Sequence, residues 1–287
     1  MAENILSSRT ETAKSEMLQQ HRPIMQLRTF NAAIKGDADY LTRYLGLHEP
    51  EEVKVTIRAS QSPPHQTEEE HQTVQFGLGS TTHFGDTVLH LLITEMHNEL
   101  ALKVFTKDMS LLKASNNKLE TPLHEAAKVG NEEVIHNLIR LSPSVVKDVL
   151  GETNGNGDTA LHVAANHNHL QGVVCQLMRL DPQVAYKRNK QGFSPLYIAI
   201  VEGHTSLVRT MLEVDIILAC TKFSDGTFPV HVAARMGNGA LVEHYSREYP
   251  DYAKLRDSCG RNLFHMAAEH RHSKVLTKET HHCTWQQ

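Results

Sequence analysis

The chain has 287 residues and a formal net charge of −4, from 29 lysines and arginines against 33 aspartates and glutamates. Apolar residues make up 40% and charged residues 22%, which is ordinary for a soluble protein. No segment has the basic excess that neutralising a phosphate backbone requires, so the composition argues against a nucleic-acid partner.

The spacing of the cysteines and the length of the apolar runs indicate in which cellular compartment the protein is expected. The four cysteines, Cys175, Cys220, Cys259 and Cys283, form no C-x-x-C pair that would suggest a metal or redox site. The first 30 residues contain no apolar core of a signal peptide. The longest apolar runs, such as Leu196–Val201, are far shorter than the ~20 residues that span a bilayer. We therefore expect a cytoplasmic protein with no direct membrane insertion.

The first part of the chain is expected to hold three segments of different kinds. Residues 1–23 are polar and are expected to be flexible. Residues 24–48 contain FNAAIKGDADYLTRYL, in which Phe30 takes the place of a histidine that recurs further on. This pattern predicts a degenerate repeat that caps an array. Residues 49–84 contain SPPHQTEEEHQ, with two prolines, three glutamates and few aliphatic residues, and are expected to form a mobile inserted loop.

One phrase then recurs six times. It reads GDTVLHLLI from Gly85, LETPLHEAA from Leu119, GDTALHVAA from Gly157, GFSPLYIAI from Gly192, GTFPVHVAA from Gly226 and GRNLFHMAA from Gly260. The sixth position of the phrase holds His90, His124, His162, Tyr197, His231 and His265, at steps of 34, 38, 35, 34 and 34 residues. A fixed period of this length is typical of a stacked array. We expect an array of six copies over residues 85–276, the last one incomplete, and a polar tail over residues 277–287.

Each copy predicts two helices and an extended connection. Thr121 and Pro122 suit the start of a helix, because the hydroxyl can accept from free amides and proline fixes φ. The small Ala126–Ala127 pair allows two helices to approach closely. Gly130 ends the helix in the left-handed region, where Met96, Asn168 and Arg271 stand in other copies. An apolar stripe then predicts a second helix; it comprises Val134, Ile135, Leu138 and Ile139. A polar stretch is expected to form a finger that leads to the next copy.

The sequence of these copies resembles the ankyrin repeat, whose signature is G-x-T-P-L-H-x-A-A-x-x-G-(H/N/D). The resemblance covers residues from about 25 to 276. It implies an all-α solenoid of helix-turn-helix units with β-hairpin-like fingers. It also implies that the threonine and histidine of the motif hydrogen-bond at the helix start and connect neighbouring repeats.

A more particular resemblance lies in LSPSVVKDV, LDPQVAYKRN and EYPDYAKLRD, where Pro143, Pro182 and Pro250 follow the second helix. The copy at Asp215 lacks the proline. With DSCGRNLFHMAAEHRH, these segments resemble plant ankyrin proteins that carry a C-terminal membrane domain (the PGG domain), of the accelerated-cell-death type. The resemblance implies a role in defence or stress signalling. Because this sequence ends where the membrane helices would begin, we expect a truncated array that lacks the membrane domain.

Metal or catalytic chemistry has weak support in the sequence. HEAAK at His124 starts like the zinc motif H-E-x-x-H, but Lys128 stands where the second histidine is needed. The histidine-rich spots are NHNH, HRH and HH, and an i, i+2 pair such as those in NHNH and HRH points to different helix faces. GETNGNGD, from Gly151, lacks the G-K-[ST] ending of a phosphate loop and is expected to lengthen one finger by about four residues. We expect no metal, no cofactor and no catalysis, and keep a metal-binding or enzymatic protein as the alternative of another class.

The favoured function is a non-catalytic scaffold for protein–protein interaction. The resemblance places the contact surface on the concave side, at positions that vary between copies. These are Asn117, Lys118, Lys128, Val129, Asn166, His167, Lys190, Gln191, Phe193, Val201, Glu202, Ser224, Asp225, Arg235 and Met236. Among them, Phe193, Val201 and Met236 are expected to be exposed apolar anchors. The partner is expected to be another protein. An alternative is a truncated regulator that associates with full-length, membrane-anchored relatives at the cytoplasmic face of the plasma membrane.

Overall fold

The computed structural model describes residues 25, 27–45, 78–167, 170–273 and 275. The chain divides into two compact units, Met1–Leu111 and Leu112–Gln287, and each unit is described by itself. Within the described residues the structure is predominantly helical, and its extended pairing is limited to one isolated bridge between Thr81 and Thr87. None of the described helices is long and apolar enough to cross a membrane.

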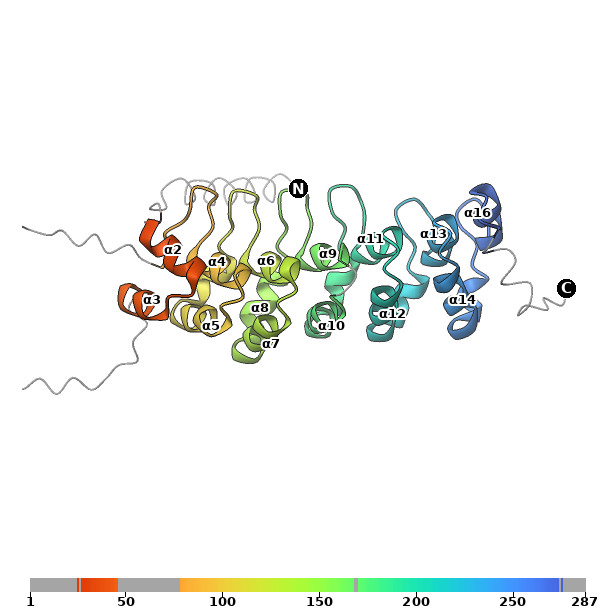
Figure 1. Ribbon diagram of the computed structural model, residues 1–287. Coiled ribbons are helices and arrows are strands. Elements are labelled where there is room, and N and C mark those ends of the chain that lie inside the picture. Colours follow the sequence, from red (N-terminus) through yellow and green to blue (C-terminus); the bar gives the residue numbers. More distant parts are fainter. Residues whose placement is uncertain (1–24, 26, 46–77, 168–169, 274, 276–287) are drawn as a thin grey trace, which may run out of the picture. The chain divides into compact units, whose positions relative to one another are not determined.

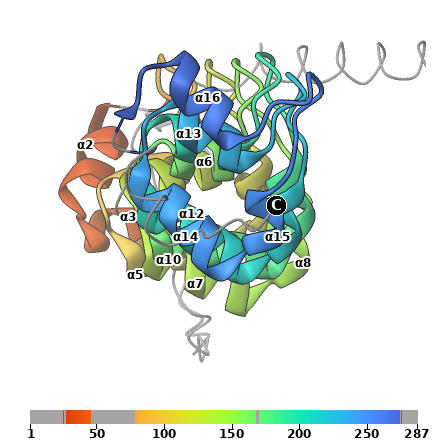
Figure 2. The same cartoon turned by 90° about the vertical axis from the view of Figure 1, so that its right-hand side faces the viewer.

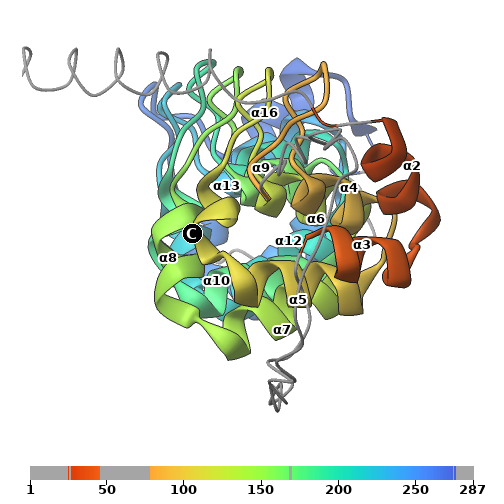
Figure 3. The same ribbon diagram turned by 90° about the vertical axis from the view of Figure 1, so that its left-hand side faces the viewer.

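Among its described residues, the first unit contains four α-helices. They are α2 (Leu27–Lys35), α3 (Ala38–Tyr44), α4 (Val88–Thr94) and α5 (Asn98–Lys107). Helix α2 packs against α3 and α4, and α4 packs against α5 (Figure 3). Helix α3 begins at Asp37, whose side chain accepts a hydrogen bond from the Tyr40 backbone N–H at 3.0 Å. Residues 24–48, in which a degenerate repeat is predicted, therefore contain the helix pair α2 and α3.

The inserted segment expected over residues 49–84 lies mostly outside the described residues, as do residues 1–23 and 277–287. It is described from residue 78 onward. There Thr81 bridges to Thr87 in an antiparallel sense, and the Thr82 N–H donates to the Asp86 carbonyl at 2.9 Å. The first finger thus includes residues before Gly85, because the turn needs a partner strand on both sides.

The second unit stacks its helices in two rows. The inner row comprises α6 (Pro122–Val129), α9 (Ala160–Ala165), α11 (Pro195–Val201), α13 (Pro229–Arg235) and α16 (Leu263–Glu269). The outer row comprises α7 (Glu132–Leu141), α10 (Gln171–Leu180), α12 (Thr205–Val214) and α14 (Gly239–Glu248). Each inner helix packs against the next inner helix in chain order (Figure 1). Viewed from the α16 end, the fingers project beyond the inner row, on the side away from the outer helices (Figure 2).

The predicted apolar pattern accounts for the packing between the rows. Ala126 and Ala127 of α6 are fully buried, which lets neighbouring inner helices approach closely. On the outer helix α7, Val134, Ile135 and Leu138 are buried. Burying a side chain of this size contributes about 1.5–3 kcal/mol each relative to exposure.

A short helix, not predicted from the sequence, follows α5 and each helix of the outer row. These elements are η1 (Met109–Lys113), α8 (Pro143–Leu150), η2 (Pro182–Tyr186), η3 (Ile216–Cys220) and α15 (Pro250–Ala253). Pro143, Pro182 and Pro250 each occupy the first turn, where the missing N–H costs nothing. Two copies lack the proline, and an aspartate precedes the short helix in each. Asp108 before η1 accepts from the Ser110 N–H, and Asp215 before η3 accepts from the Ile217 N–H, both at 3.0 Å.

The extra length of one repeat lies in α8, not in the finger. The finger that starts at Asn154 closes with a hydrogen bond from the Asn154 N–H to the Asp158 carbonyl at 2.9 Å. The next finger closes in the same way, between Asn189 and Phe193. Helix α8 has eight residues where η2 has five. The expectation that GETNGNGD lengthens a finger is therefore wrong, because the added residues extend an apolar helix.

The turn after the inner helix is left-handed, as predicted. Gly130 has φ 73°, and Met96 and Arg271 adopt φ 61° and 60° at the same position. Asn168 lies outside the described residues. Among the described non-glycine residues, one more has a positive φ that was not predicted: Leu119, at φ 62°, stands where the other copies of the motif begin with glycine.

Candidate functional site

The motif histidine connects one repeat to the next. The backbone N–H of Thr121 donates to Nδ1 of His124 at 3.1 Å, and the threonine Oγ1 lies 2.9 Å from the same nitrogen. Nε2 of His124 donates to the carbonyl of Asp158, 2.9 Å away in the next finger. Nδ1 must accept and Nε2 must donate, so His124 is neutral with its proton on Nε2. The predicted structural role of the histidine is confirmed.

The same arrangement recurs in the following copy. The Thr159 N–H donates to Nδ1 of His162 at 3.1 Å, and Nε2 of His162 donates to the Phe193 carbonyl at 3.1 Å. Burial lowers the pKa of His124 and of His162, although the hydrogen bond to the carbonyl opposes the shift in each case. Within the described residues, no group of three or more histidines, cysteines or acidic residues is placed to hold a metal ion.

The fingers are shaped by a side chain that the sequence analysis missed. Oδ1 of Asn116 accepts two backbone hydrogen bonds, from Lys118 at 2.9 Å and Glu120 at 3.0 Å. Equivalent pairs are made by Asn154, Asn189 and Asp257. These residues stand three positions before the first residue of the motif, so the recurrence of Asn and Asp at a fixed offset is a detectable signal for such turns.

Hydrogen bonds also run from finger to finger. The Gly155 N–H donates to the Lys118 carbonyl at 2.8 Å, and the Lys190 N–H donates to the Asn156 carbonyl at 3.1 Å. Further along, the Ser224 hydroxyl donates to the Gly192 carbonyl at 3.0 Å, and the Ser258 N–H donates to the Gly226 carbonyl at 3.2 Å. The fingers of the second unit therefore form a continuous row beside the inner helices. We call the side formed by the finger bases and by α6, α9, α11 and α13 the inner surface.

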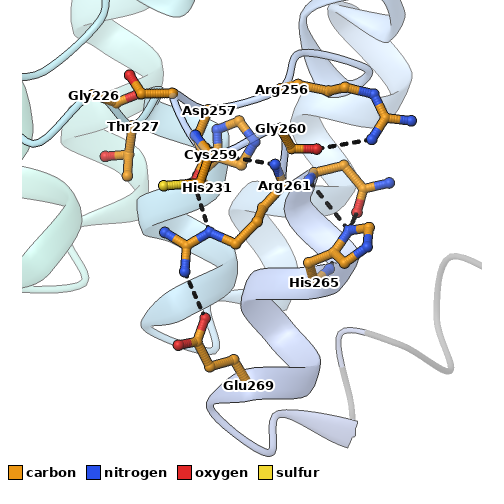
Figure 4. A network of polar contacts seen from close by, with 12 residues as sticks. Gly226, Thr227, His231, Arg256, Asp257, Cys259, Gly260, Arg261, His265 and Glu269 are labelled. Carbon is orange, nitrogen blue, oxygen red and sulfur yellow. Dashed lines mark hydrogen bonds and ion pairs between the residues drawn. The ribbon is translucent and has the colours of Figure 1, made fainter.

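The last described finger is held by a network of ionic and hydrogen-bonded side chains (Figure 4). Nε of Arg261 donates to Oδ2 of Asp257 at 2.8 Å, and Nη1 of Arg261 donates to Glu269 at 2.9 Å. Although burial favours the neutral acid, the hydrogen bonds from Arg261 and Cys259 hold the pKa of Asp257 below its ordinary value. The network braces the finger against α16, and we assign it a structural role.

A depression of about 390 Å³ opens on the inner surface, between the finger bases and the helices α9 and α11. Seven of the expected contact residues line it: Lys128, Asn166, His167, Gln191, Phe193, Val201 and Glu202. Nine residues that were not expected complete the lining: Glu120, Asn154, Asn156, Asp158, His162, Val163, Asn189, Tyr197 and Ile198. The structure thus brings about half of the expected contact residues together around one hollow.

The other expected residues lie outside this depression. Asn117, Lys118 and Lys190 are exposed on the fingers, and the Lys190 ammonium donates to the Gly155 carbonyl at 2.7 Å. Val129 is partly buried at the end of α6. Ser224, Asp225, Arg235 and Met236 belong to the following finger and helix, and Met236 is 43% exposed.

An aromatic cluster replaces the histidine connection at Tyr197. The Tyr197 ring stacks on Phe193, with centroids 4.6 Å apart and planes at 16°, and meets the Phe223 ring edge-on at 5.1 Å. The Tyr197 hydroxyl accepts a hydrogen bond from Nη2 of Arg235 at 2.9 Å, and Nη1 of Arg235 lies 3.2 Å from Asp225. Phe193 is partly buried, with the Tyr197 ring stacked on it, which corrects the expectation of a freely exposed anchor.

Comparisons with known proteins agree with this architecture. Residues 137–222 match the family model for ankyrin repeats (three copies), and residues 118–147 match that for a single ankyrin repeat. The crystal structure of the ankyrin repeat domain of Bcl-3 has a TM-score of 0.68 to this chain at 20% identity, and the match covers 88% of this chain and 99% of that one.

Curated relatives are similar at modest identity. Protein ACCELERATED CELL DEATH 6 of Arabidopsis thaliana is 26% identical over 211 residues, which are 64% of this chain and 30% of that protein. Ankyrin repeat-containing protein ITN1 of the same species is 32% identical over 136 residues, which are 45% of this chain and 21% of that protein. The chain thus spans less than a third of the length of these relatives. It carries ankyrin repeats, has the ankyrin-repeat fold, and is similar to ankyrin proteins of Arabidopsis.

Proposed function

We propose that the chain is a non-catalytic interaction module that binds a segment of another protein on its inner surface. Ankyrin repeats are typical of protein–protein interaction domains. The observation that carries the proposal is the depression of about 390 Å³, where residues from three successive copies converge. Its mixed lining, with half-exposed Phe193 and Val201 among polar side chains, resembles the composition of interface cores with polar rims.

The hydrogen bonds made by the repeat histidines support a binding function over a catalytic one. In His124 and His162 both ring nitrogens already hold backbone groups. A histidine that acts as a general base needs a nitrogen that can reach the substrate proton. Using either residue in this way would break the connection between two repeats.

We further propose that the chain acts in defence or stress signalling in the cytoplasm. It is supported by the similarity to the Arabidopsis protein ACCELERATED CELL DEATH 6. The free thiols of Cys175, Cys220 and Cys259 suit a reducing compartment.

Two matched substitutions test the binding surface without changing its charge. Gln191→Trp fills the depression with a bulky side chain, and Gln183→Trp places the same side chain on η2, away from it. Both glutamines are exposed. We expect the Gln183→Trp chain to capture the same partners as the wild type in affinity purification with cross-linking, and the Gln191→Trp chain to lose them. Equal capture by both variants, with unchanged melting curves, would refute the inner-surface proposal.

A further inference from the structure

The depression on the inner surface has a marked excess of negative charge. Its lining includes the carboxylates of Glu120, Asp158 and Glu202. Among the described residues that line it, the one lysine or arginine is Lys128, whose ammonium lies 3.3 Å from Glu125. The Glu125 side chain is largely buried. Its carboxylate forms an ion pair with Lys128 and so offsets the positive charge of that residue. The three lining carboxylates therefore favour a cationic occupant.

The aromatic wall of the depression also favours a cation. Phe193 and Tyr197 both line it and stack on each other. Tyr197 is fixed in place, because Phe223 packs against its ring and Arg235 donates to its hydroxyl. A cation near the face of such a ring gains about 0.5–1 kcal/mol at an exposed site. This attraction is independent of the carboxylates and acts in the same direction.

The polar lining is held in place before a partner arrives. Oδ1 of Asp158 accepts from Nδ2 of Asn189 at 2.8 Å. The Asn154 side chain holds the backbone of the same finger as Asp158. An acceptor that is already oriented loses less conformational freedom when it binds. An anionic or purely apolar occupant would meet these carboxylates at a cost, through repulsion or through their desolvation.

We propose that this depression receives an arginine side chain presented by the partner segment, beside Phe193 and Tyr197 and among the carboxylates of Asp158 and Glu202. Arginine fits better than lysine, because its planar guanidinium can stack on an aromatic ring and form paired hydrogen bonds with a carboxylate. The inference rests on the proposed function and adds the chemistry of the recognised side chain. It predicts that the partner segment carries a basic residue at one fixed position.

A direct test uses single amino-acid amides as probes of the full chain. Acetyl-arginine amide is titrated into the ¹⁵N-labelled protein, and acetyl-citrulline amide, which has nearly the same shape without the charge, serves as the comparison. We expect saturable shifts of amides near Asn156, Gln191 and Glu202 with arginine, and at least about threefold weaker binding of citrulline. Equal binding of the two amides, or shifts confined to another surface, would overturn the inference.

Two carboxylate variants localise the effect. Glu202→Gln removes one lining charge, whereas Glu213→Gln makes the same change at an exposed site on α12, away from the depression. We expect Glu202→Gln to weaken arginine binding by about three- to fivefold, the range of an exposed ion pair. Glu213→Gln should leave it unchanged. Unaltered binding by the Glu202→Gln chain would count against the site.

A peptide display selection on the full chain separates this inference from the proposed function. Peptides that are enriched in arginine at one position, and lost with both Gln191→Trp and Glu202→Gln, would support both. Peptides that Gln191→Trp blocks but that show no basic enrichment would leave the proposed function standing and overturn the arginine site. Peptides that bind the Gln191→Trp chain as well as the wild type, or the recovery of none, would contradict both.

Discussion

Nε2 of His162 lies 3.1 Å from the carbonyl oxygen of Phe193, a residue of the next repeat. The contact transmits the position of one helix start to the neighbouring finger, and Phe193 in turn forms part of the aromatic wall of the depression. The residue that joins two repeats therefore also fixes the geometry of the candidate binding surface.

Replacing His162 with alanine should destabilise the protein. The change leaves the Thr159 N–H without its acceptor and removes one of the two hydrogen bonds to the Phe193 carbonyl, which keeps the bond from the Asn189 N–H. A lost buried hydrogen-bond partner costs about 1–3 kcal/mol. His136→Ala, at an exposed site on α7, is the matched control and should change stability little. Urea unfolding followed by circular dichroism measures both variants. An unchanged midpoint for His162→Ala would contradict the structural role.

Replacing Leu119 with glycine should stabilise the protein. Leu119 is 45% exposed and adopts φ 62°, a conformation that costs a residue with a side chain about 1–2 kcal/mol. The greater freedom of glycine in the unfolded chain offsets part of that gain, so we expect a net increase of about 0.5–1 kcal/mol. Leu119→Ala keeps the Cβ atom and should show no such gain. Thermal unfolding of the two variants distinguishes relief of strain from loss of the leucine side chain.

The hydrogen bond between Tyr197 and Arg235 should appear as a coupling energy in a double-mutant cycle. Tyr197→Phe removes the hydroxyl and Arg235→Met removes the donor, and each change affects a partly buried pair. We expect the two effects to be non-additive by about 0.5–1.5 kcal/mol in urea unfolding. Additive effects would show that the contact contributes nothing to the junction between these repeats.

Acid should destabilise the protein below neutral pH through the buried histidines. Burial lowers the pKa of His124 and His162 below the ordinary value of 6.5, so the unfolded chain binds more protons as the pH falls through that value. Their contribution to stability is complete above about pH 6.5 and is lost on acidification toward the folded pKa. Burial raises the pKa of Glu125, which acts in the opposite sense but on a single group.

Melting temperatures between pH 7.5 and 5.5 measure this dependence. His162→Asn removes one of the titrating groups and should give a shallower decline than the wild type. His136→Asn makes the same substitution at an exposed site on α7 and is the control for the change of side chain itself. A wild-type stability that stays constant or rises over this range would contradict the assignment of neutral, buried histidines.

The structural role of the histidines could be predicted because it recurs in register. Tyrosine at position 197 and phenylalanine at position 30 occupy the same place as the histidine, which a packing position tolerates and a metal ligand does not. The placement of the 38-residue step could not be predicted, since PSVVKDVL in α8 is too short to show a helical period while GETNGNGD has the composition of a loop. The composition of GETNGNGD therefore suggested a longer finger, whereas the added residues form an extra turn of the preceding helix α8.

The candidate surface was predictable in its location but not in its chemistry. Asn166, Gln191 and Glu202 could be placed on it from their positions in the repeat. The contact between Tyr197 and Arg235 joins residues of different copies. It depends on Tyr197, which departs from the repeat pattern, and on Arg235, which stands at a position that varies between copies. Likewise, Glu120 and Asp158 stand at finger positions whose sequence is typical of any polar loop. Their carboxylates line one depression because the fingers stack side by side.

Site-specific photo-cross-linking tests the claim of an inner binding surface most directly. Benzoylphenylalanine is placed at position 191, which lines the depression, or at position 183 on η2, which does not. We expect a cross-linked partner from position 191 and none from position 183. Cross-links from position 183 alone would contradict it.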